Sequence, residues 1–497
     1  MAKSIMIQGT MSNSGKSFIT AGLCRIFKQD GYKVAPFKSQ NMALNSFITK
    51  EGLEIGRAQA MQAQACQIEP TSDMNPILLK PTSDMGSQVI VGGEVMGNMK
   101  AMDYYANKRA LFPAVMEAYH RLDQAYDIIV IEGAGSPAEI NLKADDIVNM
   151  GMAKRAKAPV LLVGDIDRGG VFASLYGTVK LLEADEQAMI KGLIINKFRG
   201  DVEILRPGLR QMEELVDLPV LGVVPMEFID IDDEDSLSGR LLQTALQGGL
   251  DVAVIRLPHI SNFTDFSVFE RLEGISLRYV NRREMLGNPD LIILPGTKNT
   301  MDDLSWLRQC GLEGAILRCH EKQTPVIGIC GGFQMLGKVL EDPFGVEHGG
   351  SMRGMGLLNT KTIFEKAKTR TQTTGKVVAA RGLFSELADM DVCGYEIHMG
   401  ITKNLGGCEP MILLEDGRTD ALANEDFSVF GSYLHGLFDD PAVVAALTAK
   451  MLAEKGMESA AAIDMEAYQE GQYDKLANLL RRSLDMDKIY EILEKGV

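Results

Sequence analysis

The sequence lacks several features that would assign it to a familiar class. Its seven cysteines are scattered and include no C-x-x-C pair, which argues against a disulfide framework and against a zinc site. No run of roughly 18 or more apolar residues is present, so we expect no membrane span. The N-terminal residues show no signal-peptide pattern, which predicts a cytoplasmic protein.

The sequence also has no excess of positive charge. The 497 residues include 51 Lys and Arg against 67 Asp and Glu, a formal net charge of −16. This balance disfavours nucleic acid or an anionic membrane surface as a partner. An anionic small-molecule substrate would therefore need locally placed lysines and arginines. The length predicts at least two domains, each large enough for a core of its own.

Residues 324–334 form the most informative stretch. A proline followed by a β-branched run predicts a buried parallel strand that ends at Cys330. Gly328, Gly331 and Gly332 surround this cysteine, and a nucleophile on a sharp strand-to-helix turn needs such small neighbours. The amide of Gly331 would then face a developing oxyanion. The pattern G-x-C-x-G-x-Q predicts a glutamine-hydrolysing cysteine; the alternative is a buried structural cysteine in a glycine-rich turn.

The start of the chain predicts a nucleotide-binding loop. A strand-like segment at 4–8, a loop at 9–17 that ends in Gly-Lys-Ser and a helical stretch at 18–29 are the context of a P-loop. In such a loop, backbone amides and the helix N-terminus cradle phosphates. Lys16 would reach the β- and γ-phosphates, and Ser17 would be a ligand of Mg²⁺. The loop residues expected to contact ATP are Gly9, Thr10, Asn13, Ser14, Gly15, Lys16 and Ser17.

The first half of the chain alternates between strands and helices. Apolar runs at 33–37, 127–132, 159–164, 191–196 and 219–225 end in glycine or polar residues and are separated by helical stretches. This alternation predicts a doubly wound parallel sheet.

Two acidic residues of this half require an explanation. Glu132 ends a fully buried strand, at the edge where the ligands of open α/β sheets collect. A glutamate in such a position needs a partner, and a metal ion would supply one. Glu54 lies at the start of a helix rich in Ala, Gln and Met, where it is either a second metal carboxylate or a solvated helix charge.

The second half repeats the α/β pattern. An acidic run within 228–238 has the composition of a linker between domains, or of a solvated surface loop. Residues 258–266 follow the next strand and are a candidate substrate loop. Of the six histidines, His435 has the order and context to be the base for Cys330. His398 is the alternative, for which we expect a structural or interdomain role.

The P-loop resembles that of a particular enzyme family. It opens with Gly-Thr and lacks the extra lysine found early in the loops of partition-type ATPases. It is similar instead to dethiobiotin synthetase and its amidoligase relatives. This resemblance implies that Lys38, at the end of the second strand, contacts phosphate; the alternative is a plain surface lysine. It also implies that Glu132 helps to hold Mg²⁺ and that Asn196 reads the nucleotide base.

The cysteine motif resembles that of class I glutamine amidotransferases. The resemblance implies that Gly296, in a Pro-Gly-Thr turn, supplies the second oxyanion-hole amide and that Gln334 binds glutamine. Most of these enzymes carry His-x-Glu, in which the glutamate orients the imidazole. This chain instead has Leu437 two places after His435. The third catalytic member is therefore unassigned, although a Cys-His pair can raise the thiolate fraction without it.

The chain as a whole resembles the cobyric acid synthase family of adenosylcobalamin biosynthesis. The segments that carry this resemblance are 9–17, 38–45, 258–265, 328–334, 394–400 and 433–436. The family implies that ATP, glutamine and a corrinoid polycarboxylate are substrates and that Mg²⁺ is a cofactor. The reaction would amidate the b, d, e and g carboxylates of adenosylcobyrinic acid a,c-diamide.

Four alternatives accompany this resemblance. One is another glutamine-dependent amidoligase, and one is a binding or regulatory protein with an inactive glutaminase domain, which would have lost the cysteine or the P-loop lysine; both residues are present. Cobyrinate a,c-diamide synthase shares both domains, although the Ser-Gln-Asn-Met run after the second strand favours the cobyric acid enzymes. A partition-type P-loop ATPase, a protein that drives assembly, would not need the pair formed by Cys330 and His435.

We therefore expect three parts. Residues 1–235 would form a dethiobiotin-synthetase-like P-loop domain on a doubly wound parallel sheet. Residues 250–445 would form a class I glutamine amidotransferase domain with a flavodoxin-like α/β fold. Residues 446–497 are amphipathic, with periodic Leu, Met and Ala, and predict terminal helices that pack on the second domain.

Overall fold

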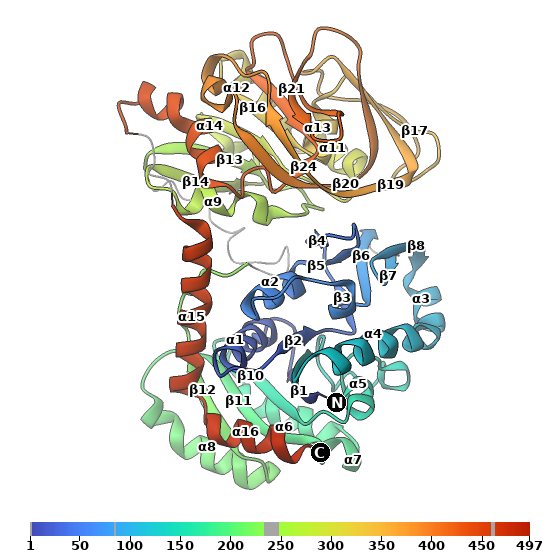
Figure 1. Ribbon diagram of the computed structural model, residues 1–497, viewed down its shortest axis with the longest axis vertical. Coiled ribbons are helices and arrows are strands. Elements are labelled where there is room, and N and C mark those ends of the chain that lie inside the picture. Colours follow the sequence, from blue (N-terminus) through green and yellow to red (C-terminus); the bar gives the residue numbers. More distant parts are fainter. Residues whose placement is uncertain (1, 84–85, 233–247, 459–462) are drawn as a thin grey trace. The chain divides into compact units, whose positions relative to one another are not determined.

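The computed structural model describes residues 2–83, 86–232, 248–458 and 463–497, and they form two compact units (Figure 1). Unit 1 comprises Met1–Ala43, Leu53–Glu234 and Glu466–Val497. Unit 2 comprises Leu44–Gly52 and Asp235–Met465. The predicted end of the first domain at residue 235 and much of the predicted acidic linker lie outside the described residues.

Unit 1 is built on a parallel sheet whose strands are buried on both faces. Among the described residues its strand order is β12-β11-β10-β1-β9-β2, and every neighbouring pair is parallel. Side chains alternate between the faces, so Ile5 and Ile7 enter one core and Met6 enters the other. The predicted doubly wound sheet is confirmed. Its strands are β1 (Lys3–Gly9), β2 (Val34–Phe37), β9 (Ile128–Glu132), β10 (Val160–Asp165), β11 (Ile190–Phe198) and β12 (Val220–Pro225).

Helices cover both faces of this sheet. One face packs against α4 (Phe112–Ala125), α5 (Met150–Ala156), α6 (Val171–Leu181) and α8 (Val202–Val216). The other face packs against α1 (Lys16–Gln29), α15 (Met465–Ser483) and α16 (Met486–Lys495).

The position of the C-terminal helices differs from the expectation. Helices α15 and α16, red in Figure 1, lie beside the blue α1 in unit 1. The buried Arg25 of α1 pairs with Glu470 at 2.6 Å and with Asp474 at 2.8 Å. The predicted packing of the tail on the second domain is wrong for these two helices, whereas α14 (Pro441–Glu454) does belong to unit 2. An amphipathic pattern specifies a helix and its apolar face but not the surface that receives it.

A smaller sheet of unit 1 has the strand order β3-β6-β7-β8 among the described residues. These strands are β3 (Gln40–Met42), β6 (Ile77–Ser83), β7 (Gly86–Val91) and β8 (Glu94–Lys100). Glu54 lies on the short strand β5 (Glu54–Gly56), ahead of α2 (Arg57–Ala65). Its buried carboxylate pairs with Lys80 at 2.9 Å, so it is not a solvated helix charge.

Unit 2 is built on a mixed sheet. Its parallel part has the order β14-β13-β15-β16-β23, and mostly antiparallel strands continue it beyond β23. The predicted α/β amidotransferase domain is confirmed, and the antiparallel extension is an addition to it. The parallel strands are β13 (Leu250–Ile255), β14 (Ile275–Val280), β15 (Leu291–Leu294), β16 (Val326–Ile329) and β23 (Val429–Ser432).

Unit 2 contains further helices and strands. Its helices include α9 (Ser267–Arg271), α11 (Thr300–Gln309), α12 (Leu312–Glu321) and α13 (Gly331–Leu336). Its further strands are β17 (Val339–Asp342), β18 (Gly350–Arg353), β19 (Thr360–Val377), β20 (Asp391–Asn404), β21 (Glu409–Leu414), β22 (Thr419–Ala423) and β24 (Leu434–His435).

A short piece of the first half of the sequence also belongs to unit 2. Residues 44–52, here named the 44–52 segment, contain strand β4 (Ser46–Ile48). Ile48 packs with Tyr395 and Ile397 in a small buried cluster. The expected division, in which residues 1–235 form one domain, therefore differs from the structure at this segment.

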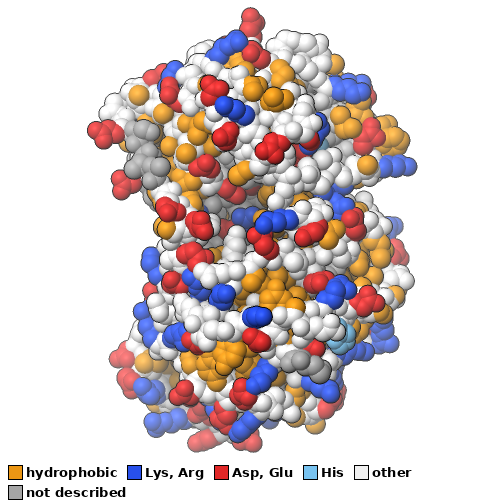
Figure 2. Space-filling view, viewed as in Figure 1, with side chains coloured by type: hydrophobic (Ala, Val, Ile, Leu, Met, Phe, Trp, Pro, Cys, Tyr) orange, Lys and Arg blue, Asp and Glu red, His pale blue; other side chains and the backbone are white. Residues whose placement is uncertain are grey.

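Surface properties agree with the composition. No helix among the described residues is long and apolar enough to cross a membrane. On the face shown in Figure 2, the basic side chains of the described residues are interspersed with acidic ones. This face therefore presents no continuous basic stripe, within the described part of the chain, of the kind that binds nucleic acid.

Candidate active site

Cys330 lies on the sharp turn between β16 and α13. Its backbone φ is 51°, a left-handed conformation that is strained for a residue with a Cβ. Close contacts require the neighbouring glycines. A Cβ at Gly328 would lie 2.6 Å from the amide N of Phe333, and one at Gly332 would lie 2.0 Å from the carbonyl O of Leu294. The turn therefore holds the thiol at the carboxyl end of a parallel strand, as a nucleophile elbow does.

His435 and Asp265 form a buried pair beside this cysteine. Nδ1 of His435 lies 2.7 Å from Oδ2 of Asp265, and the amide of Gly436 donates to Oδ1 at 3.3 Å. Burial alone would lower the pKa of His435, but the Asp265 carboxylate and the neighbouring Cys330 more than offset this and raise the pKa to about 10. The imidazole is therefore protonated at neutral pH and can donate a proton to a group in the site.

The raised pKa also links this pair to folding stability. The folded state binds the His435 proton more tightly than the unfolded chain, whose pKa is near 6.5. The stabilisation is therefore fully present below pH 6.5 and is lost as the pH rises through about 10.

Asp265 occupies the position next to His435 that a third catalytic member would take, which the sequence left unassigned. It lies in the turn Phe263–Phe266 after β13, 170 positions before His435. The sequence did single out residues 258–266 as a candidate substrate loop. It could not pair this loop with the histidine, because the contact depends on which strands neighbour each other in the folded sheet.

The two predicted oxyanion-hole residues lie at one side of the cysteine. Gly331 begins α13 directly after Cys330, and a Cβ there would lie 3.1 Å from the amide N of Thr297. A Cβ on Gly296 would lie 2.8 Å from Cε1 of His435. The turn at Gly296 and the amide after the nucleophile thus border the same part of the site, as donors to one oxyanion must.

Gln334 joins the cysteine turn to further polar groups. Its Oε1 accepts a hydrogen bond from Oγ1 of Thr300 at 2.8 Å, and its Nε2 donates to the hydroxyl of Tyr433 at 3.3 Å. Oγ1 of Thr300 also lies 3.3 Å from Oε1 of Glu347, whose Oε2 accepts from the amide of Met301 at 3.1 Å. Desolvation raises the pKa of Glu347 to about 8, although these donors oppose it. Sequence reasoning did not identify Glu347.

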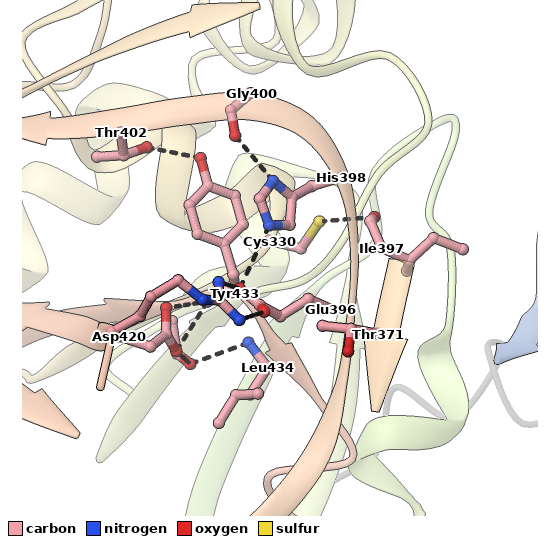
Figure 3. Close-up of polar contacts among 12 residues, drawn as sticks. Cys330, Thr371, Glu396, Ile397, His398, Gly400, Thr402, Asp420, Tyr433 and Leu434 are labelled. Atoms are coloured by element: carbon pink, nitrogen blue, oxygen red, sulfur yellow. Dashed lines mark hydrogen bonds and ion pairs between the residues drawn. The ribbon is translucent and has the colours of Figure 1, made fainter. Parts of the chain in front are cut away.

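His398, the alternative catalytic histidine, has other partners (Figure 3). Its ring stacks on Tyr433 with centroids 3.8 Å apart, and its Nδ1 donates to the carbonyl O of Gly400 at 2.8 Å. Its Nε2 lies 3.5 Å from Oε1 of Glu396, which also pairs with Arg418 at 2.6 Å. Burial opposes ionisation of Glu396, but the nearby His398 and the hydrogen-bonded Arg418 hold its pKa below the usual value. These contacts favour a structural role for His398.

The predicted P-loop connects β1 to α1 in unit 1. Gly15 has φ = 96°, and a Cβ there would lie 1.9 Å from Nδ2 of Asn196, so this position requires glycine. Nζ of Lys16 donates to the carbonyl O of Gly135 at 3.1 Å. Nδ2 of Asn196 donates to the carbonyl O of Ser14 at 3.0 Å, which places Asn196 against the loop.

Glu132 accepts hydrogen bonds from three different elements. Its Oε1 accepts from Oγ of Ser17 at 2.8 Å and from Nζ of Lys38 at 2.8 Å. Its Oε2 accepts from Nε2 of Gln62. Lys38 is only 3% exposed, so the alternative of a plain surface lysine is wrong. The predicted phosphate and metal residues therefore meet at the carboxyl edge of the parallel sheet, where ligands of this fold bind.

The rest of the loop carries two buried hydroxyl groups. Among the described residues, Oγ1 of Thr10 and Oγ of Ser14 are buried and have no hydrogen-bond partner. Buried polar atoms are generally paired, so two unpaired hydroxyls in one loop fit a site built for phosphate oxygens. Gly9 is the last residue of β1, and a Cβ there would lie 2.2 Å from Oγ of Ser14. The carbonyl O of Asn13 accepts a hydrogen bond from Nζ of Lys197.

Family models match both halves of the chain. Residues 251–443 match the model described as a CobB/CobQ-like glutamine amidotransferase domain. Residues 5–236 match the model described as a CobQ/CobB/MinD/ParA nucleotide binding domain.

Curated relatives align with the chain along its whole length. Cobyric acid synthase of Ruminiclostridium cellulolyticum is 56% identical over 504 residues, which cover 100% of this chain and 98% of that protein. The enzymes of the same name from Lachnoclostridium phytofermentans and Yersinia enterocolitica are 55% and 50% identical, and the alignments cover 100% of this chain and 100% and 99% of theirs. Among solved structures, PurLQS from Thermotoga maritima matches 41% of this chain and 99% of its own with 19% identity and a TM-score of 0.34.

Proposed function

The chain belongs to the cobyric acid synthase family, and on this premise we propose that it amidates the b, d, e and g carboxylates of adenosylcobyrinic acid a,c-diamide to give adenosylcobyric acid. Glutamine supplies the nitrogen and ATP activates each carboxylate. The observation that carries the proposal is the presence of two constellations on one chain. Unit 2 has a thiol beside a buried His-Asp pair, and unit 1 has a P-loop beside a buried lysine-carboxylate cluster.

In unit 2, Cys330 is the proposed nucleophile of glutamine hydrolysis. Its Sγ attacks the carboxamide carbon, and the backbone at Gly331 and Gly296 stabilises the resulting oxyanion. The imidazolium of His435 gives its proton to the leaving nitrogen, so ammonia departs and a thioester remains. Water then attacks the thioester and gives a proton to His435. Glutamate leaves, and the thiolate and imidazolium are restored while Asp265 holds Nδ1 in place.

Gln334 and Glu347 are the proposed binding groups for the backbone end of glutamine. The amide of Gln334 is fixed by Thr300 and Tyr433 and can serve the α-carboxylate. The α-ammonium needs an anionic acceptor, and Glu347 supplies a carboxyl group that also contacts Thr300.

We expect Glu347→Gln to raise the KM for glutamine about 10-fold or more with little change in kcat, because a hydrogen bond to a charged group would be lost. In the unaltered protein, KM should fall as the pH rises through about 8, since the ionised carboxylate is the form that pairs with an ammonium. The folded state alone keeps this proton between pH 4.5 and about 8, so the contribution of Glu347 to stability declines across that range. Steady-state glutaminase kinetics on both sides of pH 8 measure these effects.

Glu341→Gln is the matched control for this prediction. Glu341 lies on β17 in a half-exposed ion pair with Lys361 and undergoes the same chemical change. Its KM for glutamine should equal that of the unaltered protein. If the KM of the unaltered protein does not change with pH, or if Glu347→Gln does not change the KM, Glu347 does not bind glutamine.

In unit 1, Lys16 and Lys38 are the proposed phosphate-binding cations, and Asn196 is proposed to contact the nucleotide base. Ser17 and Glu132 offer adjacent oxygen atoms that would hold Mg²⁺, which, when bound, neutralises charge on the phosphate oxygens. The carboxylate of the corrinoid attacks the γ-phosphorus, ADP leaves, and the acyl phosphate forms. Ammonia then displaces inorganic phosphate and leaves the amide.

The proposal is tested by supplying two acceptors separately to the purified protein, with ATP and glutamine. Products are resolved by mass spectrometry, and ADP and glutamate are quantified. We expect four successive amidations of adenosylcobyrinic acid a,c-diamide. Turnover confined to the unamidated cobyrinic acid would instead assign the reaction of a cobyrinate a,c-diamide synthase. Turnover of neither acceptor, with glutamine hydrolysis intact, would overturn the corrinoid assignment and leave the glutaminase assignment standing.

A further inference from the structure

We propose that the 44–52 segment is a positioning element of the glutaminase site: it holds Tyr395, which in turn confines the imidazole of His435. The inference rests on the proposed catalytic roles of Cys330 and His435 and concerns what fixes their geometry. A group that transfers protons must keep one orientation, because small misplacements of reacting groups cost large factors in rate.

The ring of Tyr395 covers one face of the imidazole of His435. Their centroids are 5.4 Å apart, and the rings are inclined by only 22°. The two residues are register partners where β20 pairs with β24, and both are buried. Asp265 fixes the ring edge at Nδ1, and Tyr395 fixes the ring plane. An aromatic face also attracts a cation, so this stack favours the protonated imidazole.

The 44–52 segment in turn fixes Tyr395. The Tyr395 hydroxyl donates to the carbonyl O of Ser46 at 3.3 Å, and its ring lies 6.2 Å from that of Phe47. Ile48 completes a buried cluster with Tyr395 and Ile397. The carbonyl O of Ile397 is the acceptor for Sγ of Cys330 at 3.7 Å (Figure 3). The segment thus touches the residues that border both the thiol and the imidazole.

A second set of contacts reaches the other support of the histidine. The amide of Ser46 donates to Oδ1 of Asn262 at 3.0 Å, and Asn262 directly precedes the turn that carries Asp265. Gln372, which is opposite Tyr395 in the β19/β20 ladder, donates from Nε2 to the carbonyl O of Ile48 at 2.7 Å. Side chains from three parts of unit 2 therefore form hydrogen bonds with three backbone groups of the segment. A segment that only covered an apolar surface would not need these three hydrogen bonds.

The segment is continuous in sequence with a proposed ATP-site residue. Leu44 follows Lys38 by only six positions in the chain, and residues 38–43 belong to unit 1. The segment thus belongs to unit 2 although it lies in the first half of the sequence.

Tyr395→Leu and Gln372→Ala test the segment from two sides. For glutamine hydrolysis we expect Tyr395→Leu to lower kcat about 10- to 100-fold, with KM nearly unchanged. Gln372 is exposed, so Gln372→Ala should fold normally and lower kcat about threefold to 10-fold through loss of its bond to Ile48. Alkylation of Cys330 by iodoacetamide near neutral pH, followed on its peptide by mass spectrometry, reports the thiolate-imidazolium pair. Its rate should fall in both variants.

Three further variants calibrate the test. Thr374→Ala, exposed on the same strand and face as Gln372, should match the unaltered protein. Tyr395→Phe keeps the stack but loses the bond to Ser46, so its kcat should lie between those of Tyr395→Leu and the unaltered protein. Asp265→Asn removes the negative charge that stabilises the protonated imidazole and should cost about 100-fold in kcat. Ammonia-dependent amidation, which needs no glutaminase, checks the synthetase in each variant.

Different results separate this inference from the proposed function. If Tyr395→Leu and Gln372→Ala leave kcat and the Cys330 alkylation rate unchanged while Cys330→Ala stops hydrolysis, the inference is wrong and the glutaminase assignment stands. A loss confined to Tyr395→Leu, with Gln372→Ala equal to Thr374→Ala, would overturn the part played by the 44–52 segment. Hydrolysis that survives Cys330→Ala would overturn the proposed function itself.

Discussion

Cys330→Ala should abolish glutamine-dependent amidation while amidation supplied with ammonium salts continues. Cys330 is the proposed nucleophile of thioester formation, and removal of a nucleophile from a catalytic set costs at least about 10⁴-fold in kcat. The residues proposed to activate the carboxylate all belong to unit 1, and free ammonia can attack the acyl phosphate without the thiol. Glutamate release and amidated product, measured with glutamine or with ammonium chloride, give the two arms of the comparison.

Cys408→Ala provides a matched control for this prediction. Cys408 is half-buried between β20 and β21, and its replacement removes a thiol without touching the elbow. Both nitrogen sources should support its full activity. Glutamine-dependent amidation by Cys330→Ala would show that another group is the nucleophile. If Cys330→Ala loses amidation with both nitrogen sources and its melting temperature is unchanged, Cys330 also serves the synthetase.

Local chemistry explains why the sequence predicted much of the two candidate sites. The P-loop and the cysteine elbow are each continuous stretches of about ten residues whose backbone geometry demands glycine at fixed places. Gly15 and Gly332 are such places, and the structure shows the contacts that exclude a side chain there. Glu132 could be singled out because a charge at the end of a fully buried strand requires a partner. Ser17 and Lys38 are two of its partners.

The residues that the sequence missed are held by contacts between distant parts of the chain. Asp265 reaches His435 across 170 positions, and nothing in the spacing of either residue encodes that pairing. Glu347 meets Thr300 only because α11 begins beside the loop that follows β17. The 44–52 segment is too short to show a hydrophobic period, so neither its strand nor its membership of unit 2 could be predicted.

Lys16→Ala should have the reverse effect of the cysteine substitution. We expect amidation to fall at least about 10³-fold with either nitrogen source, because a cation that neutralises charge on the transferring phosphoryl group would be lost. Glutamate release should persist, since Cys330, His435 and Asp265 all belong to unit 2. ADP formation, amidated corrinoid and glutamate are measured on one preparation.

The persistence of glutamate release in Lys16→Ala serves as an internal control for the folding of unit 2. Lys16 donates to the carbonyl O of Gly135, so its removal could disturb the loop, and Lys16→Arg keeps a charge there with a different shape. Arginine should restore part of the ADP formation if charge is what the phosphates require. Full amidation by Lys16→Ala would move the nucleotide site away from the P-loop. Cys330→Ala and Lys16→Ala should thus each lose one half-reaction and keep the other. Such reciprocal losses require two chemically separate sites, of which one produces the ammonia that the other consumes.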